Sequence, residues 1–226
     1  QKVLDQMRKA HRDHVTKIRD VGFLPEGEIH SRSKGSTPYE MGHDDKKYPF
    51  KKIHAAADMA SSMRSKDVLA ITKLLDDDDS AVRYWGALGL LMQEKAGVKK
   101  GRTKLLDALN DKSLYVRVIA AEALGKYGSK EDLAKAVETL GKTVDPIKNG
   151  CFPSMLAMNA IDHLDDKSKS LIPLIQSMPR TPENVDGRFK GYVGRLVDTT
   201  LKELGAPTKA QPKPKKKKDR KKDQKK

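Results

Sequence analysis

Two stretches of the chain carry the same spacing of apolar residues, one copy 34 residues after the other. The apolar positions of the first copy recur in the second, as Leu75, Val82, Ala87 and Leu90, then Leu109, Val116, Ala121 and Leu124. Each copy contains an apolar helix end, an Asp-containing turn and a second helix that opens with Val-Arg. Self-similarity at a period of about 20 to 50 residues is typical of solenoids. The sequence therefore predicts an all-α array of stacked helix pairs.

The pattern of apolar and polar positions divides the chain into four regions. Residues 1–19 are expected to form an amphipathic helix, residues 20–48 an irregular linker, and residues 49–205 a solenoid of about four helix pairs. Residues 206–226 are mainly Lys, Pro, Asp and Gln, which predicts a disordered tail. Because a structureless loop as long as the linker is unusual in a compact domain, we expect it to pack on something or to lie between domains.

Turns and capping residues set the expected helix boundaries inside the solenoid. Ser65 is predicted to cap a helix that ends at Leu75, and Ser80 one that runs to about Ala96. After Pro146 the repeat register slips. Further helices are expected over residues 99–110, 114–127, 130–142, 168–178 and 189–204.

The repeated Val-Arg pair has a structural interpretation. The valines are expected to face the core, while Arg83 and Arg117 reach the Asp-containing turn of a neighbouring repeat. The alternative is a row of arginines that binds an anion. The run of four aspartates at residues 76–79 lacks the alternating ligands, Gly and distal Glu of a calcium loop. We therefore interpret it as a turn in which Asp and Ser cap the next helix.

Composition excludes several classes of protein. A single cysteine, Cys151, cannot form a disulfide within the chain or a four-cysteine zinc site. No apolar run approaches the roughly 18 residues of a transmembrane helix. Only 5% of residues are aromatic, which weakens any interpretation based on stacking of nucleic-acid bases.

The net charge of +15 is concentrated near the C-terminus. Such a tail attracts polyanions, with an affinity that falls as salt rises. The positive charge of the tail does not distinguish a nucleic acid from a sulfated or carboxylated glycan or from an anionic lipid surface. The alternative is that the tail only keeps the protein soluble. The candidate polyanion-binding residues are Lys213, Lys215, Lys216, Lys217, Lys218, Arg220, Lys221 and Lys222.

Three groups of residues were weighed as reactive sites. Residues 151–155 read Cys-Phe-Pro-Ser-Met, whereas the nucleophile motif of sulfatases, Cys-x-Pro-Ser-Arg, ends in Arg. We interpret Cys151 as a partly buried structural thiol at a junction between a loop and a helix. His11 and His14 lack an identifiable third metal ligand, and residues 43–45 fit a solvated loop. The sequence therefore nominates no catalytic, cofactor-binding or metal-binding residue.

The repeats resemble HEAT repeats. Residues 116–125 read Val-Arg-Val-Ile-Ala-Ala-Glu-Ala-Leu-Gly, the pattern of the short HEAT type, and residues 82–90 repeat it with two glycines in place of alanines. The resemblance covers about residues 49–205 and implies a HEAT-repeat-like α-solenoid.

Three segments add a narrower resemblance. They are Ile-Arg-Asp-Val-Gly-Phe-Leu-Pro-Glu at residues 18–26, Ser-Thr-Pro-Tyr-Glu at 36–40 and Ala-Ala-Ala-Asp-Met-Ala at 55–60. Together they are similar to the region after the catalytic domain in certain bacterial arylsulfatase-like proteins. Residues 1–19 then correspond to the last helix of that domain.

This resemblance implies a parent in the periplasm or outside the cell that hydrolyses the sulfuric esters of sulfated glycans with formylglycine and a calcium ion. Its catalytic residues and calcium ligands would lie upstream of Gln1, a start without Met that we interpret as a fragment or processed product. The expected partners are the upstream catalytic domain and, through the tail, a sulfated glycan. A free-standing scaffold for a protein or nucleic acid is the alternative, and a HEAT-like lyase is a third possibility without a supporting acid–base set.

Overall fold

The computed structural model describes residues 1–208 and contains helices without strands over that range. The α-helices are α1 Lys2–Ile18, α2 Glu26–Arg32, α3 Pro38–Gly42, α4 Phe50–Ser61, α5 Val68–Lys73, α6 Ser80–Met92, α7 Glu94–Ala108, α8 Leu114–Tyr127, α9 Lys130–Thr143, α10 Pro146–Asn149, α11 Cys151–His163, α12 Ile172–Ser177 and α13 Lys190–Glu203. The 3-10 helices are η1 Val21–Phe23, η2 Ser65–Asp67, η3 Leu74–Asp76 and η4 Asp165–Leu171. Residues 209–226, most of the tail predicted to be disordered, lie outside the described residues.

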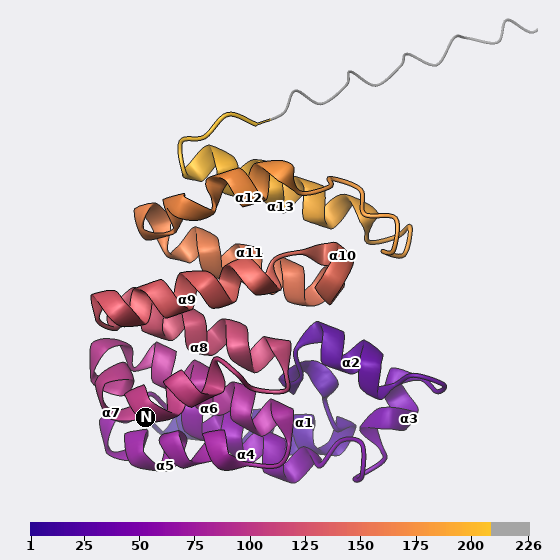
Figure 1. The fold of residues 1–226 in the computed structure, drawn as a ribbon. Coiled ribbons are helices and arrows are strands. Elements are labelled where there is room, and N and C mark those ends of the chain that lie inside the picture. Colours follow the sequence, from indigo (N-terminus) through magenta and orange to yellow (C-terminus); the bar gives the residue numbers. More distant parts are fainter. Residues whose placement is uncertain (209–226) are drawn as a thin grey trace, which may run out of the picture.

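The helices of the solenoid stack in two layers (Figure 1). The first layer consists of α4, α6, α8, α11 and α13, each in contact with the next. The second layer consists of α5, α7, α9 and α12, which pack on the helices of the first. The pairs α5–α6, α7–α8, α9–α11 and α12–α13 form the array, which confirms the predicted all-α solenoid of about four helix pairs.

A continuous core runs between the two layers. Its buried side chains extend along the chain from Val68 to Leu204. The repeated apolar residues Leu90 and Leu124 are 0% exposed. Burying one such side chain contributes about 1.5–3 kcal/mol, but a single helix pair would leave its apolar face in water. Each pair is therefore stable only beside its neighbours.

Glycines allow the helices to approach closely. A Cβ atom on Gly89 would lie 2.8 Å from Cγ2 of Ile71 and 3.0 Å from Cβ of Ala60. A Cβ atom on Gly125 would lie 2.7 Å from Cδ2 of Leu164. Alanine at position 89 would force the helices to shift, whereas alanine at position 125 would require the end of the Leu164 side chain to move.

Some predicted helix boundaries are wrong. Helix α6 ends at Met92 rather than near residue 96, because the chain reverses at Glu94, whose φ is 52°. The residue that caps α6 is Asp79, whose carboxylate accepts the N–H of Ala81 at 2.8 Å, and Ser80 is the first helical residue. The stretch from Ser65, expected to be one helix, is divided into η2, α5 and η3.

The segment 20–48, expected to be irregular, contains η1, α2 and α3 and packs on the solenoid. Figure 1 shows α2 and α3 at one side of the stack. Leu24, Met41 and Tyr48 of this segment share a second apolar cluster with residues of α4 and α6. The indole N–H of Trp85 donates to the carbonyl of Phe23 at 2.8 Å. The segment is therefore packed on the repeats.

Candidate functional site

Helix α2 lies against the first layer at an unusually close distance. A Cβ atom on Gly27 would lie 1.6 Å from the hydroxyl oxygen of Tyr115 and 2.8 Å from Cβ of Phe152. Tyr115 belongs to α8 and Phe152 to α11. The ring of His30 stacks on Phe152, with 4.8 Å between centroids. Because α2 bridges two consecutive first-layer helices, the solenoid surface near it is built partly from the linker.

An ion-pair network fixes α2 to the first two repeats. The guanidinium of Arg32 donates to both carboxylate oxygens of Asp79, at 2.9 and 3.0 Å, and to Glu28 at 2.6 Å. Glu28 also accepts the hydroxyl of Ser80 at 2.9 Å and that of Ser113 at 3.3 Å. The side chains of Arg32 and Glu28 are only 15% and 7% exposed. Three charges are therefore buried together and satisfied by one another, as buried charges must be.

The network lowers the pKa of Asp79. Burial by itself disfavours the charged carboxylate, but the hydrogen bonds and charge of Arg32, with backbone N–H groups at the start of α6, outweigh that effect. The pKa of Arg32 is raised, since the two carboxylates outweigh its own desolvation. The ionised pair is thus the stable form.

The predicted arginine ladder is present for Arg83 and absent for Arg117. Arg83 forms a two-point ion pair with Asp111 in the next Asp-containing turn, at 2.6 and 2.8 Å, and also donates to the carbonyls of Asp77 and Asp78. Arg117 instead donates to the carbonyl of Asp111, in its own turn. Asp145, which lies 34 residues after Asp111, instead accepts the N–H groups of Ile147 and Lys148 at the start of α10.

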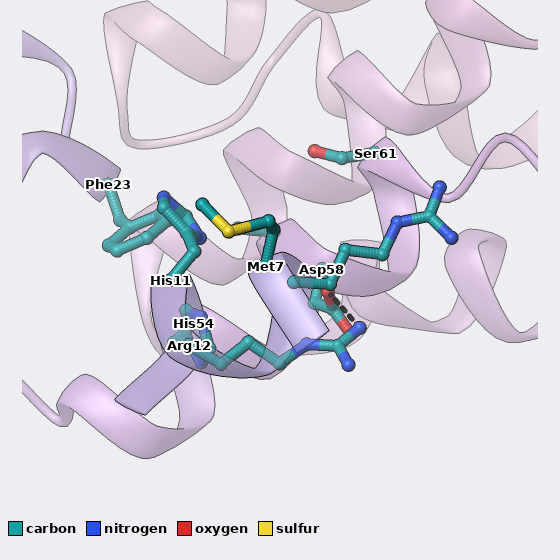
Figure 2. Close-up of a pocket in the computed structure, with 9 residues that line it drawn as sticks. Met7, His11, Arg12, Phe23, His54, Asp58 and Ser61 are labelled. Carbon is teal, nitrogen blue, oxygen red and sulfur yellow. Dashed lines mark hydrogen bonds and ion pairs between the residues drawn. The ribbon is translucent and has the colours of Figure 1, made fainter. Parts of the chain in front are cut away.

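A cleft separates α1 from α4 (Figure 2). It has a volume of about 470 Å³, and Met7 and His11 of α1 face Phe23, His54 and Ala57 across it. Arg12 bridges the two helices through Asp58, with N–O distances of 3.0 and 3.2 Å. Of the residues of α1, only Val15 is buried. The helix is therefore held to the solenoid at its C-terminal part and by one exposed ion pair.

The candidate reactive residues are buried or engaged in contacts within the fold. Cys151 is 8% exposed, its Sγ lies 3.5 Å from Sδ of Met155, and burial raises the pKa of its thiol. A protonated, covered thiol is a poor nucleophile, which supports the structural interpretation. His43 contacts the carbonyl of Tyr39 at 2.8 Å, and Asp45 pairs with Arg19 at 2.6 Å.

The aspartate run is engaged in contacts, as expected of a structured turn. Asp76 pairs with Lys104 at 2.5 Å, Asp77 with Lys52 at 2.7 Å, and Asp79 with Arg32. Across residues 1–208, no group of three or more His, Cys, Asp or Glu side chains is placed to hold a metal ion.

Other sequence predictions concern the tail and membranes. All the candidate polyanion-binding residues, from Lys213 to Lys222, lie outside the described residues. Over the described part of the chain, no helix has both the length and the apolar character needed to cross a bilayer.

The residues that dock α2 were missed in the sequence. Glu28 and Arg32 stand four apart, the spacing of an ion pair on one helix face, and Pro25 directly precedes two acidic residues suited to a first helical turn. These signals indicate a short helix. They were obscured by the surrounding Gly and Pro, and nothing local indicates that Asp79 and Ser113 are the partners.

Comparison with known families agrees with this architecture. A family model of HEAT repeats matches residues 68–150, from α5 to α10. The stacked helix pairs define an α-solenoid, and together with this match they support the assignment of the chain as a HEAT-repeat protein. Such repeats form a helical scaffold for interactions with other proteins. Comparisons with curated proteins and with solved structures give no match.

Gly27→Ala should loosen α2, because the new methyl group overlaps the side chain of Tyr115. We expect a loss of about 1–3 kcal/mol of unfolding free energy. The substitution should also accelerate amide hydrogen exchange in residues 26–32 more than in α8. Gly187→Ala is the control, since a Cβ atom there meets nothing within 4 Å. Unchanged protection of α2 in Gly27→Ala would contradict the close docking.

Arg32→Met should destabilise the chain more as pH rises. In the unchanged protein, Asp79 has a lower pKa in the folded state than in the unfolded state, and this difference stabilises the fold. The stabilisation is fully present at a pH above the pKa of the unfolded state, and it is lost as the pH falls through the pKa of the folded state. Without Arg32, burial opposes ionisation of Asp79. We expect a loss of about 3 kcal/mol at pH 7 that shrinks toward pH 3, measured by urea unfolding.

The control for this experiment is Arg12→Met, which breaks an exposed pair. Its effect should stay below about 1 kcal/mol and should not vary with pH. An equal loss at pH 7 and pH 3 for Arg32→Met would mean that Arg32 stabilises the chain only by packing.

Proposed function

We propose that this chain is the non-catalytic C-terminal accessory region of a sulfatase-like hydrolase. In this proposal α1 packs on the upstream catalytic domain, and the solenoid stabilises or orients that domain. The formylglycine, the calcium ion and the acid–base residues belong to the upstream domain. This chain supplies no catalytic group, and its solenoid is the interaction scaffold.

The observation that carries the proposal is the exposed apolar face of α1. Val3, Leu4 and Met7 are 72%, 47% and 63% exposed. Met7 follows Leu4 by three residues and Val3 by four, so the three side chains share one face of the helix. A monomeric surface does not ordinarily gather large apolar side chains in this way without a partner. The same face continues to Val15 in the C-terminal part of α1, where the helix is buried against the solenoid, and Arg12 adds an ion pair with Asp58.

A rigid joint at the end of α1 supports an orienting role. Arg19 closes the helix with φ 50°, and its guanidinium donates to the carbonyls of Gly42 and Tyr48 at 2.5 and 3.2 Å. The hydroxyl of Tyr48 donates in turn to the carbonyl of Asp20 at 2.5 Å. Arg19 and Asp20 lie in the segment that resembles the linker of arylsulfatase-like proteins. The joint therefore sets the direction of α1 relative to the repeats.

The second candidate function is that of a free-standing scaffold for a nucleic acid or protein. One observation favours it. Arg188 lies 4.5 Å over the ring of Phe189, and Arg195 lies 4.8 Å over Tyr192, so cations and aromatic rings alternate beside α13. Such surfaces suit stacked bases and phosphates. The first proposal accounts for α1 and its joint, which this alternative leaves without a role.

The coding sequence upstream of Gln1 tests the function directly. The accessory-region proposal predicts an open reading frame that carries a Cys- or Ser-x-Pro-Ser-Arg motif. It also predicts that the 226-residue chain releases no sulfate from a chromogenic aryl sulfate. A start codon immediately before Gln1, or measurable turnover by the chain alone, would reject the proposal and favour the free-standing scaffold.

Leu4→Asp combined with Met7→Asp should free α1 from the upstream domain. Burial of each side chain contributes about 1.5–3 kcal/mol, so hydrogen exchange of α1 in the complete polypeptide should become at least about tenfold faster. Gln1→Asp with Gln6→Asp is the control with the same added charge, and it should keep α1 protected. Equal exchange of α1 in the complete polypeptide and in the 226-residue chain would contradict the docking role.

A further inference from the structure

A small pocket lies between α2 and the first layer, on the side opposite to the ion pairs of Arg32. Its volume is about 190 Å³. Its walls carry three aromatic side chains, Tyr84 of α6, Tyr115 of α8 and Phe152 of α11. Met155 and Leu156 add apolar surface. The pocket exists only because α2 is docked, since Glu26 and Gly27 of that helix complete the lining.

One carboxylate in the lining has little compensation. The side chain of Glu26 is 63% exposed, and its only ion pair in the described part of the chain is with His30, at 3.9 Å, which counts only when His30 is protonated. The negative charge of Glu26 acts within the pocket. The pKa of Tyr115 is raised mainly by burial, then by the charge of Glu28 and then by that of Glu26. The pKa of the Cys151 thiol is raised mainly by burial and then by the charge of Glu26. Glu28 differs from Glu26, because Arg32 neutralises it.

Aromatic rings and an unneutralised carboxylate select for a cation. An anion would be repelled by Glu26 and by the negative faces of the rings. A neutral apolar group would fit the walls and leave the charge unused. An alkylammonium group uses both, through cation–π attraction to the rings and an ion pair with Glu26. Its aliphatic stem suits Met155 and Leu156.

We propose that this pocket binds the side-chain ammonium of a lysine, free or methylated, presented by a partner protein. A protein partner is favoured because HEAT repeats form scaffolds for protein interactions. The pocket has room for one side chain and is too small for a segment of peptide backbone. The inference does not depend on the sulfatase relation, because it uses neither α1 nor the joint.

The test uses the 226-residue chain and short capped peptides that differ only in one central residue. Nuclear magnetic resonance should show saturable shifts of the Gly27 amide and the Met155 methyl group with lysine and with trimethyllysine peptides. The norleucine peptide, which has no charge, should give none. Glu26→Gln should weaken lysine binding about fivefold, as expected for an exposed ion pair. Tyr84→Phe should leave it unchanged, since it keeps the ring.

The matched control is Glu203→Gln, which removes an exposed carboxylate of α13 outside the pocket and should not affect binding. Equal shifts with the norleucine peptide would overturn the proposal in favour of an apolar site. Tighter binding of an arginine peptide, or unchanged affinity in Glu26→Gln, would overturn it as well. If Lys215→Gln, Lys216→Gln, Lys217→Gln and Lys218→Gln together shift the Met155 signal without any peptide, the occupant is the chain's own tail, and the proposal of a partner lysine is overturned.

Discussion

Every surface of this protein depends on the close stacking of the first-layer helices. Gly89 approaches Ile71 and Ala60, and Gly125 approaches Leu164, at distances where a side chain would not fit. Because the pairs stack in sequence, the N-terminal ends of α6, α8 and α11 lie near one another along one edge. Helix α2 contacts all three ends, through Asp79, Ser113 and Phe152. A wider spacing would separate these groups and leave α2 without a binding surface.

The docking of α2 shows how a short helix becomes stable. A helix of seven residues is not expected to persist alone in water, because nucleation costs more than its few hydrogen bonds return. Here its carboxylate Glu28 accepts hydroxyl hydrogens from two successive repeats, while Arg32 pairs with the residue that caps α6. Removing one member would leave a buried charge without a partner, so the network acts as a unit. The linker thereby fastens two repeats together from outside.

The sequence was sufficient for the architecture because the repeat reflects packing that is local along the chain. The 34-residue recurrence placed Val82 and Val116 in the core, and both are 0% exposed. It also placed Arg83 against the next turn. The boundary between α6 and α7 was missed because the reversal depends on Glu94 in a left-handed conformation, which its residue type disfavours.

The candidate site could not be predicted in the same way, because its residues come from distant parts of the chain. Glu28 and Ser113 are 85 positions apart, and Trp85 binds the carbonyl of Phe23 across 62 positions. No periodicity encodes such pairs. The Gly and Pro of the linker indicated breaks in structure correctly, and yet the glycine at position 27 serves close contact with Tyr115 rather than a turn.

The position of α2 constrains what the scaffold can bind on its first layer. A partner that displaced α2 would have to break the buried pairs of Arg32 and expose the carboxylates of Glu28 and Asp79. A partner that binds beside α2 avoids this cost and finds a surface made jointly by linker and repeats. Since the linker leads directly from α1 through the joint at Arg19, force or binding on α1 acts on the same segment that completes this surface. The linker therefore connects α1 with the surface that it forms together with the repeats.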